Sequence, residues 1–65
     1  MNRVEEILLR LYDFMGFKKD LEFCEKFDIK ANTLSTWKKR GTIPYDLLEK
    51  ISQNENISLD WLVFG

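Results

Sequence analysis

The segment DLEFCEKFDIKANTLSTWKKR, at residues 20–40, constrains the fold of this chain more than any other part of it. In its first half, Leu21, Cys24 and Phe27 recur at helical spacing, which predicts a short amphipathic helix with one apolar stripe. Asp20 stands before this stripe, where its side-chain oxygen can cap the free N–H groups at the start of a helix.

The second half of the segment predicts another short helix. Asn32 is a candidate cap for it, and Leu34 and Trp37 lie three residues apart on one face. The opposite face is small, polar and basic, as expected for a helix that enters the major groove of DNA. Two such helices joined by a short turn predict a helix-turn-helix at residues 20–40, and hence a DNA-binding domain.

Residues 28–31 form the predicted turn between the two helices. The first residue of such a turn usually adopts a left-handed backbone conformation, for which glycine is favoured. We expect Asp28 to adopt it at a cost on the order of 1 kcal/mol relative to glycine, because Asp tolerates this region better than most residues.

The rest of the chain predicts three more helices. One covers residues 1–15, capped by Asn2 and ended by Gly16; one begins at Pro44; and the last is capped by Ser58. The side chains expected to face the core are Val4, Ile7, Leu8, Leu11, Phe14, Met15, Leu47, Leu48, Ile51, Leu59, Trp61 and Leu62. No strand pattern is found. We therefore predict an all-α fold, a compact bundle of about five short helices in one domain, residues 1–65.

The composition bounds the function. A single cysteine excludes an internal disulfide, and the apolar runs are too short to span a membrane, so we expect a cytoplasmic protein. The chain has no histidine, no glycine-rich phosphate loop and no metal-ligand spacing. We therefore expect that the protein is not an enzyme and that it binds no cofactor, no metal and no small-molecule ligand. Cys24, on the apolar stripe, is interpreted as a buried hydrophobe rather than a nucleophile or redox sensor.

The net charge of −1 hides an uneven distribution. Residues 18–40 carry seven basic and four acidic side chains, and residues 29–45 carry four basic and no acidic ones. Attraction to phosphate depends on local potential rather than on total charge. The charge pattern is therefore compatible with DNA binding through the central segment.

The blocks NTLSTWKKRGTIPYDLLEKI and NISLDWLVFG resemble the N-terminal domain of bacteriophage CI-type repressors, within the broad Cro/repressor helix-turn-helix class. The elements T-L-S-x-W-K-K-R-G, I-P and S-L-D-W-L-x-x-G carry the resemblance, which extends over nearly all of residues 4–65. It implies a lambda-repressor-like all-α domain that binds operator DNA as a homodimer and represses transcription. Such repressors usually carry a C-terminal oligomerisation domain, which is absent from residues 1–65, so we expect an excised domain or truncated product. Cys24 and Asp28 stand where the family often has alanine and glycine.

The resemblance also implies which residues contact DNA, with residues 32–40 as the recognition helix. The implied base contacts are Lys30, Ala31, Asn32, Thr33, Ser35, Thr36 and Lys39. The implied phosphate contacts are Lys18, Lys19, Asp20, Lys38 and Arg40, the first three at a helix N-terminus.

Simpler alternatives stay open for several of these residues. Asn32 can be a helix cap only, Ser35 and Thr36 can be inert surface, and Lys18 and Lys19 can be solvated lysines. Trp37 can stack on bases, although its spacing from Leu34 favours the core. The competing function is a protein–protein interaction module without DNA binding, which docks through its basic face or through Leu9, Tyr12, Val63 and Phe64.

Overall fold

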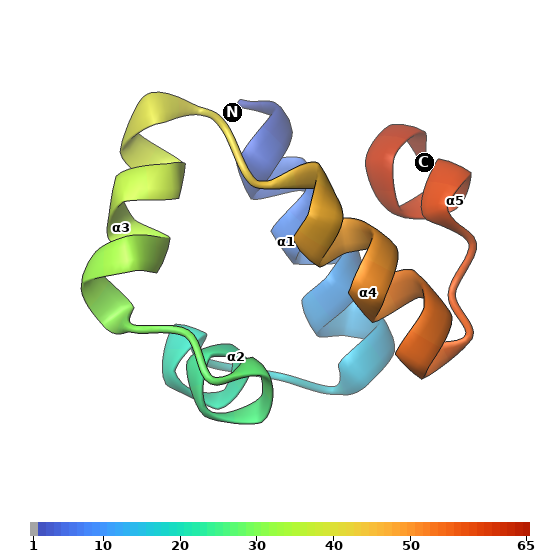
Figure 1. The fold of residues 1–65 in the computed structure, drawn as a ribbon, viewed down its shortest axis with the longest axis horizontal. Helices are drawn as coiled ribbons and strands as arrows, with labels where there is room; N and C mark the ends of the chain where they lie inside the picture. The colour runs from blue at the N-terminus through green and yellow to red at the C-terminus, as the bar shows by residue number, and fades with distance from the viewer. Residues whose placement is uncertain (1) are drawn as a thin grey trace.

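In a computed structural model, which describes residues 2–65, the chain forms five helices and no strand within that range (Figure 1). The helices are α1 (Arg3–Met15), α2 (Asp20–Phe27), α3 (Ala31–Arg40), α4 (Tyr45–Glu55) and α5 (Leu59–Phe64). The predicted all-α bundle is confirmed. The predicted start of the first helix at Met1 lies outside the described residues. None of the described helices has the length and apolar character needed to cross a membrane.

The core is built around α1, which packs against both α3 and α5. α2 packs against α3, and α4 packs against α5, so that α3 and α5 lie at opposite ends of the fold (Figure 1). The buried apolar side chains are Val4, Ile7, Leu8, Leu11, Phe23, Cys24, Leu34, Leu48, Ile51, Ile57 and Leu62. Every helix contributes to this one core, which fixes the orientation of α3.

Local rules correctly predict three helix ends, but they place the start of α4 one residue early, because it begins at Tyr45 with Pro44 at the cap position. The Glu5 N–H donates to Asn2 Oδ1 at 2.9 Å, and the Trp61 N–H donates to Ser58 Oγ at 3.2 Å, so both predicted caps are confirmed. Gly16 ends α1 with φ 76°, a left-handed conformation that glycine adopts without a Cβ penalty. Asp28 adopts the predicted left-handed conformation, with φ 56°.

The apolar face of α2 was predicted wrongly. Leu21, expected on the core stripe, is 61% exposed, whereas Phe23 is fully buried. The two residues lie roughly 200° apart around a helix of 3.6 residues per turn, so only one of them can face the core. The stripe that the fold buries runs through Phe23, Cys24 and Phe27, which places the larger aromatic ring inside.

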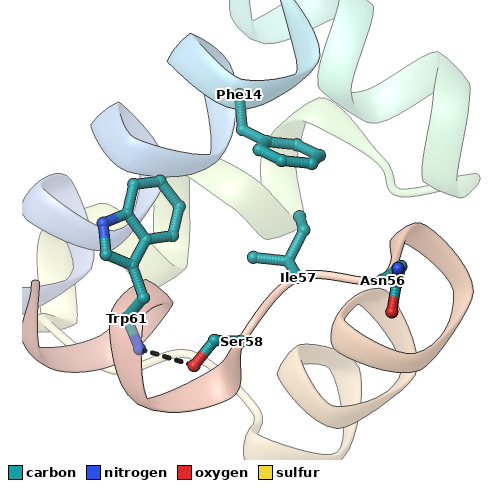
Figure 2. Close-up of a pocket in the computed structure, with 5 residues that line it drawn as sticks. All are labelled: Phe14, Asn56, Ile57, Ser58 and Trp61. Atoms are coloured by element: carbon teal, nitrogen blue, oxygen red, sulfur yellow. Dashed lines mark hydrogen bonds between the residues drawn. The ribbon is translucent and has the colours of Figure 1, made fainter.

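Two further core assignments were wrong. Phe14 is 53% exposed and Trp61 is 39% exposed. Their ring centroids lie 6.4 Å apart, and they face each other across an open groove that the side chain of Ile57 also lines (Figure 2). The two rings therefore pack against each other at the edge of the core and stay partly exposed to solvent.

We expect Asp28→Gly to stabilise the domain by about 0.5–1 kcal/mol, because glycine adopts a φ of 56° without steric penalty. Urea unfolding at neutral pH measures the change. Asp28→Ala is the matched control: it keeps a Cβ in the left-handed region and is expected to be less stable than the native chain. A glycine variant less stable than the alanine variant would contradict the backbone explanation.

Candidate nucleic-acid interface

α3 presents a polar and basic surface to solvent and buries only Leu34, which is 2% exposed. The side chains exposed on α3 and at its cap are Lys30, Ala31, Asn32, Ser35, Thr36, Lys39 and Arg40. Thr33, Trp37 and Lys38 are half-buried. All seven residues predicted to contact bases are therefore exposed or half-buried on or beside one helix. Trp37 packs against the core, as its spacing from Leu34 predicted.

The start of α3 corrects the predicted role of Asn32. α3 begins at Ala31, its cap position is Lys30, and no side chain caps its first N–H groups by a hydrogen bond. Asn32 is instead an exposed residue inside the first turn, and its backbone carbonyl accepts a hydrogen bond from Thr36 Oγ1 at 3.0 Å. The Asn32 side chain is thus not committed to capping this helix.

The charges on α3 are all positive. The first turn holds no acidic residue, and the last turn holds Lys38, Lys39 and Arg40. Uncapped N–H groups and the helix dipole give the N-terminus partial positive charge, to which Lys30 adds a full charge. An anion therefore meets favourable potential at both ends of α3.

At the start of α2 the carboxylate of Glu22 occupies part of the place that an anion would take. Glu22 Oε1 accepts the backbone N–H groups of Lys18, at 2.8 Å, and Lys19, at 3.1 Å. Asp20 was predicted to cap α2 but is its first helical residue, and Lys19 is at the cap position. The Lys18 and Lys19 side chains are exposed, whereas their N–H groups are already satisfied.

Asp20 links α1, α2 and α3 through its two carboxylate oxygens. Oδ1 accepts the Tyr12 hydroxyl at 2.9 Å, and Oδ2 forms an ion pair with Lys38 Nζ. The hydrogen bond from Lys38 lowers the pKa of the Asp20 carboxyl, whereas burial, followed by the hydrogen bond to Asp20, raises the pKa of the Tyr12 phenol. Sequence patterns did not predict this network, because its members lie 8 and 18 residues apart.

A hydrogen bond from α1 also holds the last turn of α3. Asn2 Nδ2 donates to the Lys38 backbone carbonyl at 2.9 Å. Asn2 therefore caps α1 with its oxygen and binds α3 with its nitrogen. This contact and the Asp20–Lys38 ion pair both join the last turn of α3 to its neighbouring helices.

The remaining candidate residues lie on other elements, and Leu9 lines the same pocket as Asp20 and Lys38. Leu9 and Phe64, two of the residues suggested for protein docking, are 56% and 67% exposed, and the Arg3 guanidinium lies 5.3 Å from the Phe64 ring centre. Cys24 is buried, and burial raises the pKa of its thiol, which keeps it unreactive. Within residues 2–65, no cluster of three or more side chains suited to hold a metal ion occurs.

Comparison with known proteins places this arrangement in a family. The family described as the bacteriophage CI repressor helix-turn-helix domain matches residues 6–65. Over 60 residues the chain is 30% identical to the Repressor protein CI of Escherichia phage 186. That match covers 92% of this chain and 31% of the relative, so the chain spans about a third of that relative's length. No solved structure gives a significant match. The chain belongs to the bacteriophage CI repressor helix-turn-helix domain family, as the sequence blocks had suggested.

Proposed function

We propose that this domain binds double-stranded operator DNA, with α3 in the major groove, and that it acts as a phage- or prophage-type transcriptional repressor. The observation that carries the proposal is the surface of α3, which is exposed, small and polar in its first two turns and basic at its end. A helix of this kind fits the major groove, where base edges can be told apart by hydrogen bonds and methyl contacts. Membership of a CI repressor family supports the same proposal.

The side chains on and beside the first turns of α3 can contact DNA bases in two ways, through hydrogen bonds and through methyl groups. Asn32 can pair with adenine through two hydrogen bonds, and Ser35 and Thr36 can donate or accept one. The methyl groups of Ala31 and Thr33 can contact thymine methyls. The full proposed set of base contacts is Lys30, Ala31, Asn32, Thr33, Ser35, Thr36 and Lys39.

The proposed phosphate contacts are Lys18, Lys19, Asp20, Lys38 and Arg40. Lys18, Lys19 and Arg40 have exposed side chains, which suits neutralisation of the DNA backbone. Asp20 can contribute only through its backbone N–H, because its carboxylate repels phosphate. Since one small domain makes few contacts, we also propose that a homodimer on DNA is the form that binds tightly.

An NMR titration of the isotope-labelled domain with mixed-sequence duplex DNA at low salt tests the proposal. Amide signals of residues 30–40 are expected to shift together and to return as salt is added, because phosphate contacts are salt-sensitive. Signals from the groove residues Phe14 and Trp61 are expected to stay in place. No shift on α3, together with shifts at that groove or at Phe64 on adding a protein partner, would favour the interaction module instead.

A further inference from the structure

We infer that Asp20 competes with DNA phosphates for Lys38, and that this competition weakens sequence-independent binding to DNA. The inference rests on the proposed function. It assigns to Asp20 a part in specificity that is separate from the base-reading face of α3.

The geometry holds Lys38 at both of its ends. Its Nζ pairs with Asp20 Oδ2, and its backbone carbonyl accepts the Asn2 side-chain amide at 2.9 Å. Asp20 is held in turn by the Tyr12 hydroxyl, which donates to Oδ1 at 2.9 Å. The Lys38 ammonium group is therefore directed to a carboxylate of its own chain in the absence of DNA.

Lys38 differs in this respect from its neighbours at the end of α3. Lys39 and Arg40 are exposed and form no ion pair within residues 2–65, whereas Lys38 is half-buried and paired. A phosphate that recruits Lys38 must break the pair and leave an unpaired carboxylate close to the negatively charged DNA backbone. Lys38 thus contributes less to the sequence-independent attraction between the domain and DNA than an unpaired lysine would.

The ion pair is weak enough to be exchanged. Its side chains are 34% exposed at Lys38 and 50% exposed at Asp20. Solvent screens such a pair, so a phosphate can replace Asp20 when the docked geometry brings it close. A poorly fitted duplex holds no phosphate firmly enough to displace Asp20, although it has phosphates that a Lys38 freed from Asp20 could neutralise. Asp20 therefore lowers the affinity most for DNA that docks without specific base contacts.

The test compares Asp20→Asn, Lys38→Gln and the double variant with the native chain. Fluorescence anisotropy measures binding to a labelled mixed-sequence duplex over a range of salt concentrations. Asp20→Asn is expected to bind about three- to tenfold more tightly at 0.1 M salt, with a salt slope steeper by about 0.9, because Lys38 becomes free to neutralise one phosphate. Lys38→Gln is expected to abolish this gain in the Asp20→Asn background, and to lower the slope by less in the native background than in that one.

Two controls separate competition from general charge and from altered folding. Asp60→Asn makes the same change in net charge on α5, at the opposite end of the fold from α3 (Figure 1), and is expected to leave the slope unchanged. Tyr12→Phe removes the hydrogen bond to Asp20 but no charge, and is also expected to keep the native slope. Thermal unfolding confirms that each variant is folded.

Each outcome bears on the inference separately from the proposed function. If the native chain binds duplex DNA with a measurable salt slope and Asp20→Asn has that same slope, the inference is wrong and the proposed function stands. An equal loss of slope for Lys38→Gln in both backgrounds also overturns it, since Asp20 would then have no effect on the phosphate contact of Lys38. No binding by the native chain at low salt overturns both.

Discussion

A Phe23→Ala variant is expected to lose most of the domain's stability and to be partly unfolded at 25 °C. Phe23 is fully buried, and its ring centroid lies 5.6 Å from that of Tyr12 and 5.3 Å from that of Phe27. Truncating a buried phenylalanine to alanine costs about 3–5 kcal/mol, because apolar contacts are lost and a cavity is left. A domain of this size is stable by only about 5 kcal/mol, so the substitution removes most of its stability.

Urea unfolding followed by far-UV circular dichroism and tryptophan fluorescence measures this loss. Leu21→Ala is the matched control, because Leu21 belongs to the same helix and is 61% exposed. Its expected cost is below about 0.5 kcal/mol, as for most surface substitutions. The reverse order, with Leu21→Ala more damaging than Phe23→Ala, would mean that α2 is rotated so that its other face is buried.

The contrast between Leu21 and Phe23 also shows where the sequence was insufficient. In α2, the spacing of Leu21, Cys24 and Phe27 and that of Phe23, Cys24 and Phe27 both satisfy a helical period. In a helix of eight residues, periodicity alone cannot decide between two such stripes. The choice is made by the aromatic cluster with Tyr12 and Phe17, which tertiary packing brings together.

Several features set by neighbouring residues were predictable, although the cap of α3 proved to be Lys30 and not Asn32. The caps at Asn2 and Ser58, the end of α1 at Gly16 and the left-handed Asp28 each depend on a few residues of local sequence. The sequence blocks were also sufficient to indicate the family, because together they extend over most of the chain. The bundle of five helices and its family therefore followed from the sequence alone.

Features set by distant residues were not predictable. Asp20 was predicted to cap α2, yet its carboxylate is used by Tyr12 and Lys38, which lie on two other helices. Trp61 has the spacing of a core residue, but it lies at the rim of the fold beside Phe14. In both cases the local sequence suits one role for the side chain, but a residue far away in the sequence contacts it and gives it another position.

The double variant Lys39→Gln/Arg40→Gln is expected to weaken binding to duplexes of any sequence by about 30- to 100-fold at 0.1 M salt. Both side chains are exposed in the last turn of α3, and neither forms an ion pair within residues 2–65. Lys39, which is proposed to contact a base, can also reach a phosphate with its ammonium group. If each of the two side chains neutralises one phosphate, their loss lowers the magnitude of the salt slope by about 1.8. Anisotropy titrations over a range of salt concentrations measure the affinity and the slope together. Because both charges also favour the C-terminal end of the helix dipole, unfolding experiments must show that the variant is folded.

The matched control, Lys26→Gln/Lys50→Gln, removes the same net charge from exposed positions on α2 and α4. Its slope is expected to change by less than about 0.5, because long-range attraction is screened over roughly 10 Å at 0.1 M salt. Equal losses in the two variants would mean that DNA responds to the overall charge of the domain, and α3 would lose its special role. A large loss confined to Lys39 and Arg40 would instead locate the attraction at the end of α3. Since the whole chain carries a net charge of −1, only such a localised effect can account for binding to a polyanion.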